Sequence, residues 1–287
     1  MGIVLTNEMV ITKVLNNNIV LGRDKKTEKI LFGKGIGFNR KFGEVLKEGI
    51  EVDKIFTIEN EQNQKNFKDI INRVDSNFIA MCEECISEIS DKLETELNES
   101  IHMSLIDHLS LAIKRIKKGE EIHNPFIVEI ETLYPKEFDL SKIFADKIRD
   151  NYKIDFPYGE LGFITLHIHS ALNNGKLSNT IKYAYLSNTI VEYVEDNLDI
   201  EIDKQSLDYA RFLVHIRFAI ERIITENRVK NELAGIIKDK YPIAYKLSKE
   251  IAKFIEEELE VEVTEDEICY LAMHIERFRQ SIATDLQ

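Results

Sequence analysis

Four histidines recur as two matched pairs along this 287-residue chain: His108 with His167, and His215 with His274. Imidazole changes charge near neutral pH and can act as a general base, a metal ligand or a nucleophile that accepts a phosphoryl group. In each pair the first histidine opens a shared sequence block, and the second follows a glutamate by seven positions. The spacing predicts two histidine sites of one design.

An internal duplication carries both pairs. Each second-copy residue lies 107 positions after its first-copy counterpart, with no gap between the matched blocks. A repeat of this length is far longer than the 20 to 50 residue units of solenoid proteins, so it predicts paired domains. The matched blocks are His108–Arg115 with His215–Arg222, Tyr134–Pro135 with Tyr241–Pro242, Leu140–Lys142 with Leu247–Lys249, and Glu160–Ile168 with Glu267–Ile275.

Helical spacing indicates how each histidine is presented. His108, Ala112 and Arg115 share one helix face beside an apolar stripe, so His108 is expected to border the core. Glu160 and His167 lie two helical turns apart on one face, and the second copy repeats this spacing. We expect the carboxylate to orient one ring nitrogen of His167 and to leave the other as a nucleophile.

Two other interpretations of these histidines remain open. A single histidine beside an apolar stripe is more often a packed core residue, although persistence of both pairs while their surroundings diverged favours a function. Metal ligation is the sharper rival, but no His-Glu-x-x-His motif occurs, and Glu276 takes the place of His169 in the second copy. Cys82 and Cys85 form a lone pair that we interpret as packing. No metal site is predicted.

Composition is that of a folded protein of two or three domains, with 44% hydrophobic and 31% charged residues. Three cysteines without a charged-then-apolar leader predict a reducing compartment, the cytoplasm. No apolar run approaches the roughly 18 residues that a membrane span requires, so no stable membrane insertion is expected.

Charge is distributed unevenly along the chain. The formal net charge is -13, yet residues 1–60 carry ten basic and eight acidic side chains, against 28 basic and 43 acidic in the remainder. Seven of the twelve glycines also precede position 50. The sequence therefore predicts a small basic head on a large acidic body, and only the head has the charge that nucleic acid would favour.

The fold predicted is multidomain: a small antiparallel β domain followed by two tandem all-α helical bundles, at residues 1–65, 66–175 and 176–287. Helical spacing begins near Phe67, the polar stretch Glu59–Lys65 is the expected linker, and Asn173–Thr180 is the expected hinge. So small a sheet buries little apolar area, so a homodimer is expected. The predicted strands are Val10–Leu15, Ile19–Leu21, Lys29–Phe32 and Lys54–Ile58.

A glycine-rich segment, Gly33-Lys-Gly-Ile-Gly-Phe38, lies in the head. It lacks the third glycine of a dinucleotide fingerprint and the Gly-Lys-Ser/Thr ending of a P-loop, so no nucleotide cofactor is predicted. Its lysine and phenylalanine, with Arg40 and Lys41, instead suit RNA phosphates and an unpaired base. Asn16–Asn18 add amides that can contact base edges. The alternative is a tight hairpin with a solvated asparagine run.

Lys13–Asn18, Gly33–Phe38 and the doubled histidine blocks together resemble the BglG/SacY/LicT family of transcriptional antiterminators, nearest its glucose-type branch. The resemblance extends from about Met9 to Ser281. It implies that the head is a co-antiterminator domain, which dimerises and binds an RNA antiterminator hairpin in nascent mRNA. It also implies that the body is two helical phosphotransferase-system regulation domains and that the protein is a regulator, not an enzyme, with no catalytic residues.

The resemblance also implies site residues. Phosphorylation is expected at His108, His167, His215 and His274, with His102 a weaker candidate because its counterpart in the second copy is a tyrosine. Many relatives have arginine at position 34, so Lys34 replaces a planar bidentate donor by a point charge. The residues expected to bind RNA are Lys13, Asn16, Asn18, Gly33, Lys34, Phe38 and Arg40.

The mechanism implied is a charge switch. In this family the sugar-specific transport enzyme II phosphorylates the first repeat to inactivate, and the phosphocarrier HPr phosphorylates the second to activate a sugar-uptake operon. Each phosphoryl group adds about -1.5 to -2 charges, which is expected to attract Arg115 or Arg222 and repel Glu160 or Glu267. Two alternatives are a helical metal-dependent enzyme and a DNA-binding activator with the same regulatory domains.

Overall fold

A computed structural model describes residues 2–24, 27–120, 123–173, 176–224, 227 and 230–285. It divides into two compact units. The first consists of Met1–Asn124 and Lys136–Leu177, and the second of Pro125–Pro135 and Ser178–Gln287. In this division the head and the first helices form one unit.

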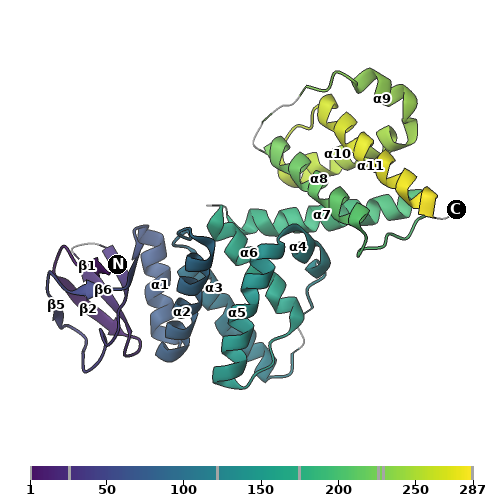
Figure 1. Ribbon diagram of the computed structural model, residues 1–287. Helices are drawn as coiled ribbons and strands as arrows, with labels where there is room; N and C mark the ends of the chain where they lie inside the picture. The colour runs from purple at the N-terminus through teal and green to yellow at the C-terminus, as the bar shows by residue number, and fades with distance from the viewer. Residues whose placement is uncertain are drawn as a thin grey trace. The chain divides into compact units, whose positions relative to one another are not determined.

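The predicted β head is confirmed (Figure 1). Five antiparallel strands form a sheet in the order β5-β2-β3-β4-β7, and β1 pairs with β6 in a second, two-stranded sheet. The four predicted strands correspond to β2, β3, β4 and β7, whereas the short strands were not predicted. The strands are β1 Ile3–Val4, β2 Met9–Val14, β3 Ile19–Asp24, β4 Thr27–Phe32, β5 Val45–Leu46, β6 Glu51–Val52 and β7 Lys54–Ile58.

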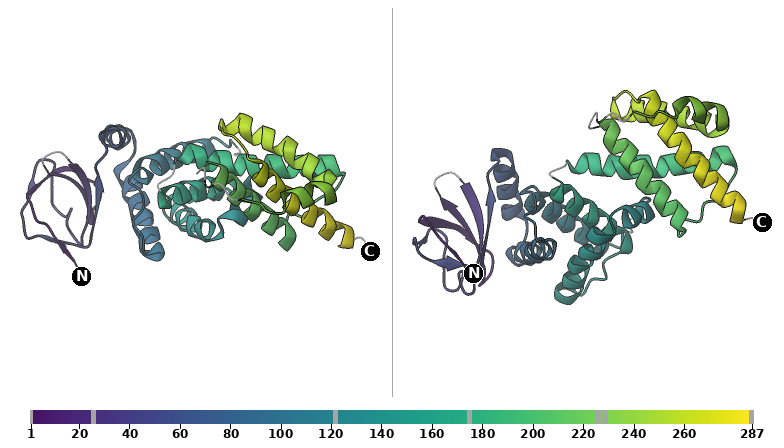
Figure 2. Two further views of the ribbon diagram at one scale, coloured as in Figure 1. Left: turned by 90° about the horizontal axis from the view of Figure 1, so that it is seen from above. Right: turned by 45° about the horizontal axis from the view of Figure 1, so that its top comes forward.

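The two faces of the five-stranded sheet belong to different cores. Alternate residues of a strand point to opposite faces. Val20 and Leu31 therefore pack inside the head, while their neighbours Ile19 and Ile30 join a core that continues into the helices. Both views of Figure 2 place the first helices beside the sheet. Helices of the same unit thus cover this face of the sheet.

The predicted linker is wrong, because a helix begins within it. Asn60 caps α1 (Glu61–Arg73) by accepting hydrogen bonds from two backbone amides of the first turn. Asp75 caps α2 (Ser76–Leu93) in the same way. A polar first turn with an asparagine cap resembles a linker in composition, but its cap satisfies the free amides of a helix start. The remaining helices of this unit are α3 (Ile101–Lys117), α5 (Pro135–Tyr152) and α6 (Tyr158–Leu172).

The second unit contains the helices of the second repeat and one short helix of the first. Three helix pairs, α4 with α9, α5 with α10 and α6 with α11, begin 107 residues apart, which confirms the duplication. In the predicted hinge, residues 174 and 175 lie outside the described residues and α7 begins directly after Lys176. The helices of this unit are α4 (Ile127–Leu133), α7 (Leu177–Leu198), α8 (Leu207–Ile224), α9 (Ala234–Lys240), α10 (Pro242–Leu259) and α11 (Glu265–Asp285).

Packing explains the cysteine pair. Cys82 and Cys85 are free thiols within the helical core, and burial raises the pKa of Cys85 to about 12. The packing interpretation is therefore confirmed. In the described parts of the chain, no helix is long and apolar enough to cross a membrane.

Candidate functional site

The asparagine hairpin and the glycine-rich loop form one surface on the head. The turn at Asn16–Asn18 joins β2 to β3, and the loop follows β4, the neighbouring strand. Asn18 Oδ1 accepts a hydrogen bond from Gly35 N at 3.0 Å, and its backbone oxygen accepts one from Gly33 N at 3.0 Å. Loop and hairpin are thus tied together, and the amide of Asn18 shapes the loop.

Close backbone approach explains one glycine that sequence reasoning did not single out. A Cβ atom on Gly37 would lie 2.2 Å from the backbone oxygen of Asn16, which is inside van der Waals contact. Gly35 has a φ of +71°, a left-handed conformation that glycine adopts without strain. At Gly33, by contrast, an added Cβ would meet its nearest atom at 3.5 Å. Gly37 and Gly35, more than Gly33, are needed for the shape of the loop.

Three of the predicted RNA-binding side chains are exposed on this loop. Lys34 and Arg40 are open to solvent, and Phe38 is 62% exposed although it is a large apolar residue. Arg40 forms a surface ion pair with Glu44, at 3.5 Å. An exposed aromatic ring on the same loop as two exposed cations offers a stacking face and charges for phosphates.

Two other predicted residues face the helices instead. Lys13 Nζ donates to the backbone oxygen of Ile71 in α1 at 2.5 Å, and Asn16 Nδ2 donates to Glu84 Oε1 in α2 at 3.1 Å. Burial lowers the pKa of Lys13 despite the opposing charge of Asp75. These two side chains therefore use their donors within the protein.

Acidic side chains of α2 also line the edge of the loop surface. A cleft of about 400 Å³ has Asn18, Lys34 and Lys54 on the head side and Glu84 and Asp91 on the helix side. Lys54 Nζ donates to Asp91 Oδ1 at 2.7 Å. Lys54 is a cation of this surface that sequence reasoning missed, because it lies in a strand remote from both motifs.

The first histidine pair lies between α3 and α6. His108 Nε2 is 2.8 Å from Oε2 of Glu160, and the rings of His108 and His167 have centroids 5.3 Å apart. His167 Nδ1 is 3.1 Å from the hydroxyl of Ser104. Glu160 is fully buried, and its other oxygen has no partner among the described residues. The expectation that Glu160 orients His167 is wrong: the carboxylate reaches the histidine of the opposite helix.

This arrangement fixes the chemistry of His108. A carboxylate oxygen accepts, so Nε2 of a neutral His108 carries the proton and Nδ1 keeps its lone pair. Sequence alone placed Glu160 and His167 on one helix face, but did not reveal which side chain the facing helix supplies. The ring nitrogen that faces away from the carboxylate is therefore Nδ1 of His108, whose side chain is 18% exposed.

His102 lies in a different environment. Its side chain is 1% exposed, its Nδ1 is 2.7 Å from Glu83 Oε2, and its ring centroid is 4.8 Å from that of Phe56 in β7. The structure places this ring in the core where the sheet meets the helices. Its ring contacts Phe56, whereas the rings of His108 and His167 contact each other.

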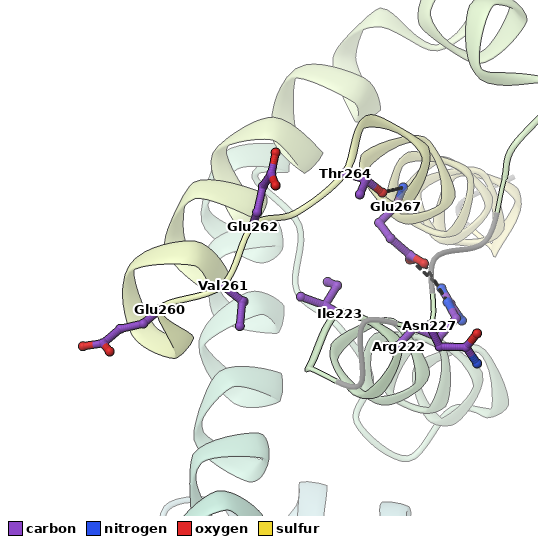
Figure 3. Close-up of a pocket in the computed structure, with 8 residues that line it drawn as sticks. All are labelled: Arg222, Ile223, Asn227, Glu260, Val261, Glu262, Thr264 and Glu267. Atoms are coloured by element: carbon purple, nitrogen blue, oxygen red, sulfur yellow. Dashed lines mark hydrogen bonds and ion pairs between the residues drawn. The ribbon is translucent and has the colours of Figure 1, made fainter.

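The second histidine pair is built differently from the same pattern. The rings of His215 and His274 stack with centroids 3.7 Å apart and planes 14° apart. Glu267, the counterpart of Glu160, accepts two hydrogen bonds from Arg222, at 2.8 and 2.7 Å. Figure 3 shows Arg222 and Glu267, with Thr264, at a pocket of about 230 Å³. Glu267, like Glu160, therefore contacts the facing helix, but its partner there is an arginine of α8 and not a histidine.

Burial keeps the inner histidine of each pair neutral. It lowers the pKa of His167 to about 3, and the nearby charge of His108 adds to the effect. It lowers the pKa of His274 to about 4, aided by His215, Arg222 and Arg277. The pKa of His215 is also lowered, by burial and then by the same two arginines. These rings therefore retain nitrogen lone pairs at neutral pH.

The metal-site alternative gains no support from the geometry. Within the described ranges, no group of three or more histidine, cysteine or acidic side chains is placed to hold a metal ion. His169, whose position weakened the metal interpretation, instead pairs with Glu137 at 2.9 Å.

Comparison with known proteins accounts for both parts of the chain. The model of the CAT RNA binding domain matches residues 9–65, and that of the PRD domain matches residues 83–171 and 188–278. The chain belongs to the BglG/SacY/LicT family of transcriptional antiterminators. As a member of this family it is an RNA-binding antiterminator regulated by the sugar phosphotransferase system.

Curated relatives of this antiterminator extend over nearly the whole chain. Protein GlcT of Staphylococcus saprophyticus is 32% identical over 277 residues, covering 96% of this chain and 99% of the relative. Protein GlcT of Staphylococcus aureus is 34% identical over 281 residues, covering 96% and 98%. The crystal structure of GlcT CAT-PRDI is 40% identical and covers 58% of this chain and 99% of that chain, with a TM-score of 0.49.

Proposed function

We propose that this antiterminator binds an mRNA leader hairpin as a homodimer in the cytoplasm and prevents termination of a glucose-type sugar-uptake operon. Its domains are residues 1–65, 66–175 and 176–287. Phosphorylation by HPr and by a sugar-specific transport enzyme II regulates it, and it has no enzymatic activity of its own. The observation that carries the RNA-binding part is the exposed Phe38, which shares a loop held by Asn18 with the exposed cations Lys34 and Arg40.

RNA recognition by the loop follows from its chemistry. Single-stranded bases splayed from a hairpin stack on aromatic faces, while lysine and arginine contact phosphates. Phe38, Lys34 and Arg40 supply these groups, and the rigid glycine backbone allows RNA to approach closely. Asn18 shapes the loop through its side-chain oxygen, which leaves its amide NH2 to donate to RNA.

The helical body limits access to part of this surface. If RNA also uses Lys13 and Asn16, it has to replace their hydrogen bonds to α1 and to Glu84 of α2. The carboxylates of Glu84 and Asp91 lie at the same cleft as Lys34 and repel a phosphate. RNA binding therefore competes with the contact between the head and α2.

A binding assay tests the RNA proposal. The leader RNA upstream of the neighbouring genes serves as probe for the full-length chain. Phe38→Ala is expected to weaken binding by roughly 5- to 150-fold. This corresponds to the loss of about 1–3 kcal/mol of binding free energy for one stacked base. Lys34→Ala is expected to reduce the slope of log affinity against log salt by about 1.

Controls make the binding assay specific. Lys47→Ala removes an equal charge from an exposed head position outside the proposed set and is expected to have a smaller effect. Glu84→Gln is expected to increase RNA affinity, because it removes a competing charge. Unchanged affinity in both Phe38→Ala and Lys34→Ala, or stronger binding of duplex DNA, would contradict the proposal.

The first histidine pair supports a phosphoacceptor role for His108. As Nδ1 bonds to phosphorus the ring becomes cationic, and Glu160 stabilises the charge through its contact with Nε2–H. His167 stays neutral beside it, so it does not repel the developing charge. The phosphoryl group then adds about -1.5 to -2 charges at the junction of α3 and α6.

Access ranks the phosphoacceptor candidates. His108 and His215 are partly exposed, whereas His102 is enclosed by the sheet and α2. Modification of His102 would require the head to separate from α3, because Phe56 covers its ring. His102 therefore remains the weaker candidate within the proposal.

Incubation with enzyme I, HPr and phosphoenolpyruvate, alone and with transport-enzyme domains, tests the phosphorylation proposal. Peptide mapping at neutral to alkaline pH identifies labelled histidines, and alanine variants of His108 and His215 serve as matched controls. We expect label on both repeats and a change in dimer population by analytical ultracentrifugation. No label on any of the four paired histidines would overturn it.

A further inference from the structure

The stacked histidines of the second repeat share a surface hollow with two arginines. Arg211 and Arg277 line this hollow of about 20 Å³ together with His215 and His274. Arg211 precedes His215 by four residues on α8, and Arg277 follows His274 by three on α11. Residues at these spacings are neighbours on one helix face, so each helix places one guanidinium beside its histidine.

The first repeat has no such cations. The counterparts of Arg211 and Arg277 are Ser104 and Ser170, and Ser104 instead meets His167 with its hydroxyl. The two arginines therefore arose or persisted in one copy only, beside a histidine pair that both copies keep. The charge of Arg277 acts on both histidines, because it helps to lower the pKa of His215 and of His274.

We propose that Arg211 and Arg277 form a phosphate-binding site around the His215–His274 pair, which retains a phosphoryl group on either imidazole. This inference rests on the proposed phosphorylation of the second repeat and names residues for it. Guanidinium groups bind phosphate through two parallel hydrogen bonds, so two of them can offset the charge of a phosphoryl group.

Both arginines are available for this role. Arg211 makes a 3.4 Å surface ion pair with Asp208, which is readily exchanged. Arg277 is exposed and forms no ion pair within the described part of the chain. Beneath them Phe212 and Phe278 stack with centroids 4.8 Å apart and planes 6° apart. Because these phenylalanines adjoin the two arginines in sequence, they hold α8 and α11 in the register that the site requires.

Phosphoryl transfer to a histidine of this site requires a phosphoryl donor and water but no other reactant. In a donor with a phosphorus–nitrogen bond, that bond breaks as the lone pair of a histidine nitrogen forms a new one. The donor nitrogen leaves with the electron pair and takes up a proton from water. Because the pKa of His274 is low, the ring is unprotonated at neutral pH and its nitrogen lone pair is available for the new bond. The arginines then bind the phosphoryl oxygens.

Phosphoramidate, a small donor of this type, tests the site in the full-length chain. The double variant Arg211→Ser/Arg277→Ser introduces the residue found at both positions in the first repeat. We expect the half-life of phosphohistidine in the second repeat, followed by phosphorus NMR, to fall about tenfold, as for the loss of about 1.4 kcal/mol of charge-assisted hydrogen bonding. The half-life in the first repeat is expected to stay unchanged.

A second readout separates binding from folding. Nitrogen NMR is expected to give a higher pKa for His215 and His274 in the double variant, because two cations are removed, and inorganic phosphate is expected to perturb these rings only in the wild type. Arg211→Lys/Arg277→Lys should restore the pKa values but only part of the half-life. Arg279→Ser, which removes an arginine paired with Glu276, is the matched control.

The outcomes distinguish this inference from the proposed function. If phosphoramidate labels the second repeat with the expected dependence on the arginines while the protein donors do not, the site stands and the regulatory proposal fails. If the protein donors label all four histidines and neither half-life nor phosphate response differs in the serine double variant, the arginine site is overturned and the regulatory proposal stands.

Discussion

The two histidine pairs share their residue types and spacing but not their pairings. In the first repeat, buried Glu160 contacts His108 of the facing helix, whereas in the second its counterpart Glu267 contacts Arg222. Arg115, the counterpart of Arg222, is exposed. A duplicated motif thus preserved its members while the carboxylate changed its partner.

The difference follows from how a buried carboxylate is compensated. A carboxylate without water requires hydrogen bonds or an opposite charge. An imidazole supplies one donor to Glu160, while a guanidinium supplies two donors and a permanent charge to Glu267. The first repeat therefore joins its carboxylate to an imidazole, whereas in the second repeat the carboxylate pairs with an arginine and arginine charges act on the histidines.

Truncation of Arg222, which pairs with Glu267, is expected to have the largest effect on the free energy of unfolding. Arg222→Ala leaves Glu267 buried without its cation, which typically costs about 3–5 kcal/mol of unfolding free energy. Arg115→Ala, at the matched position 107 residues earlier, is expected to change it by less than about 0.5 kcal/mol because the side chain is exposed. Urea unfolding of both variants measures the contrast.

The double variant Arg222→Ala/Glu267→Gln sharpens this test. Replacing the carboxylate by an amide removes the unpaired charge, so much of the lost stability should return. Equal losses for Arg222→Ala and Arg115→Ala would mean that the two glutamates are compensated alike, and the contrast between the repeats would then be wrong.

The role of the carboxylate in phosphorylation gives the next largest effect. Glu160→Gln keeps an oxygen that can accept from His108 but removes the charge that stabilises the imidazolium, so labelling of His108 is expected to slow by roughly 10- to 100-fold. Glu267→Gln should slow labelling of His215 less, because both oxygens of that carboxylate accept hydrogen bonds from Arg222. Initial rates with one donor compare the variants.

A reduced rate at His215 as large as that at His108 would show that both carboxylates act on histidines. Unfolding curves of both glutamine variants are the necessary control, since a general loss of structure would slow both sites together.

Sequence reasoning succeeded where the signal was local or repeated. The four principal strands follow from β-branched runs between turns, and the duplication follows from one constant offset. It failed at Glu59–Lys65, because a polar first turn looks like a linker until the cap of Asn60 is recognised. The short strands β1, β5 and β6 have two residues each, too few for any periodicity.

The candidate sites were found as residues but not as contacts. The spacing placed Glu160 and His167 on one helix face. The partner of the carboxylate, however, is His108 of α3, and this contact depends on how two helices pack. Likewise Lys13 and Asn16 were identified as donors, but not that α1 and α2 occupy them. Tertiary pairing of this kind leaves no periodic trace in the chain.

Acid should destabilise both repeats through their inner histidines. The folded-state pKa values of His167 (about 3) and His274 (about 4) lie below the usual 6.5, so the unfolded chain binds more protons between pH 6.5 and those values. The free energy of unfolding is therefore highest above pH 6.5. It should fall by up to about 1.4 kcal/mol per pH unit for each histidine as the pH drops through this window.

Unfolding measured from pH 7 to pH 4 checks this slope. His167→Gln and His274→Gln should each flatten it by removing one group that must remain unprotonated in the folded state. A slope identical in wild type and both variants would assign the acid sensitivity to other groups.

The smallest effect tests the hydroxyl that the second repeat lacks. Ser104→Ala removes the 3.1 Å contact with His167 Nδ1 and should cost about 1 kcal/mol of unfolding free energy. It should also alter the nitrogen chemical shifts of His167, because the contact helps to fix which ring nitrogen is protonated. Ser110→Ala, on the same helix but bonded to the backbone oxygen of Asp107, is the control. If both variants leave the His167 shifts unchanged, Ser104 does not set its tautomer, and the first pair is defined by Glu160 alone.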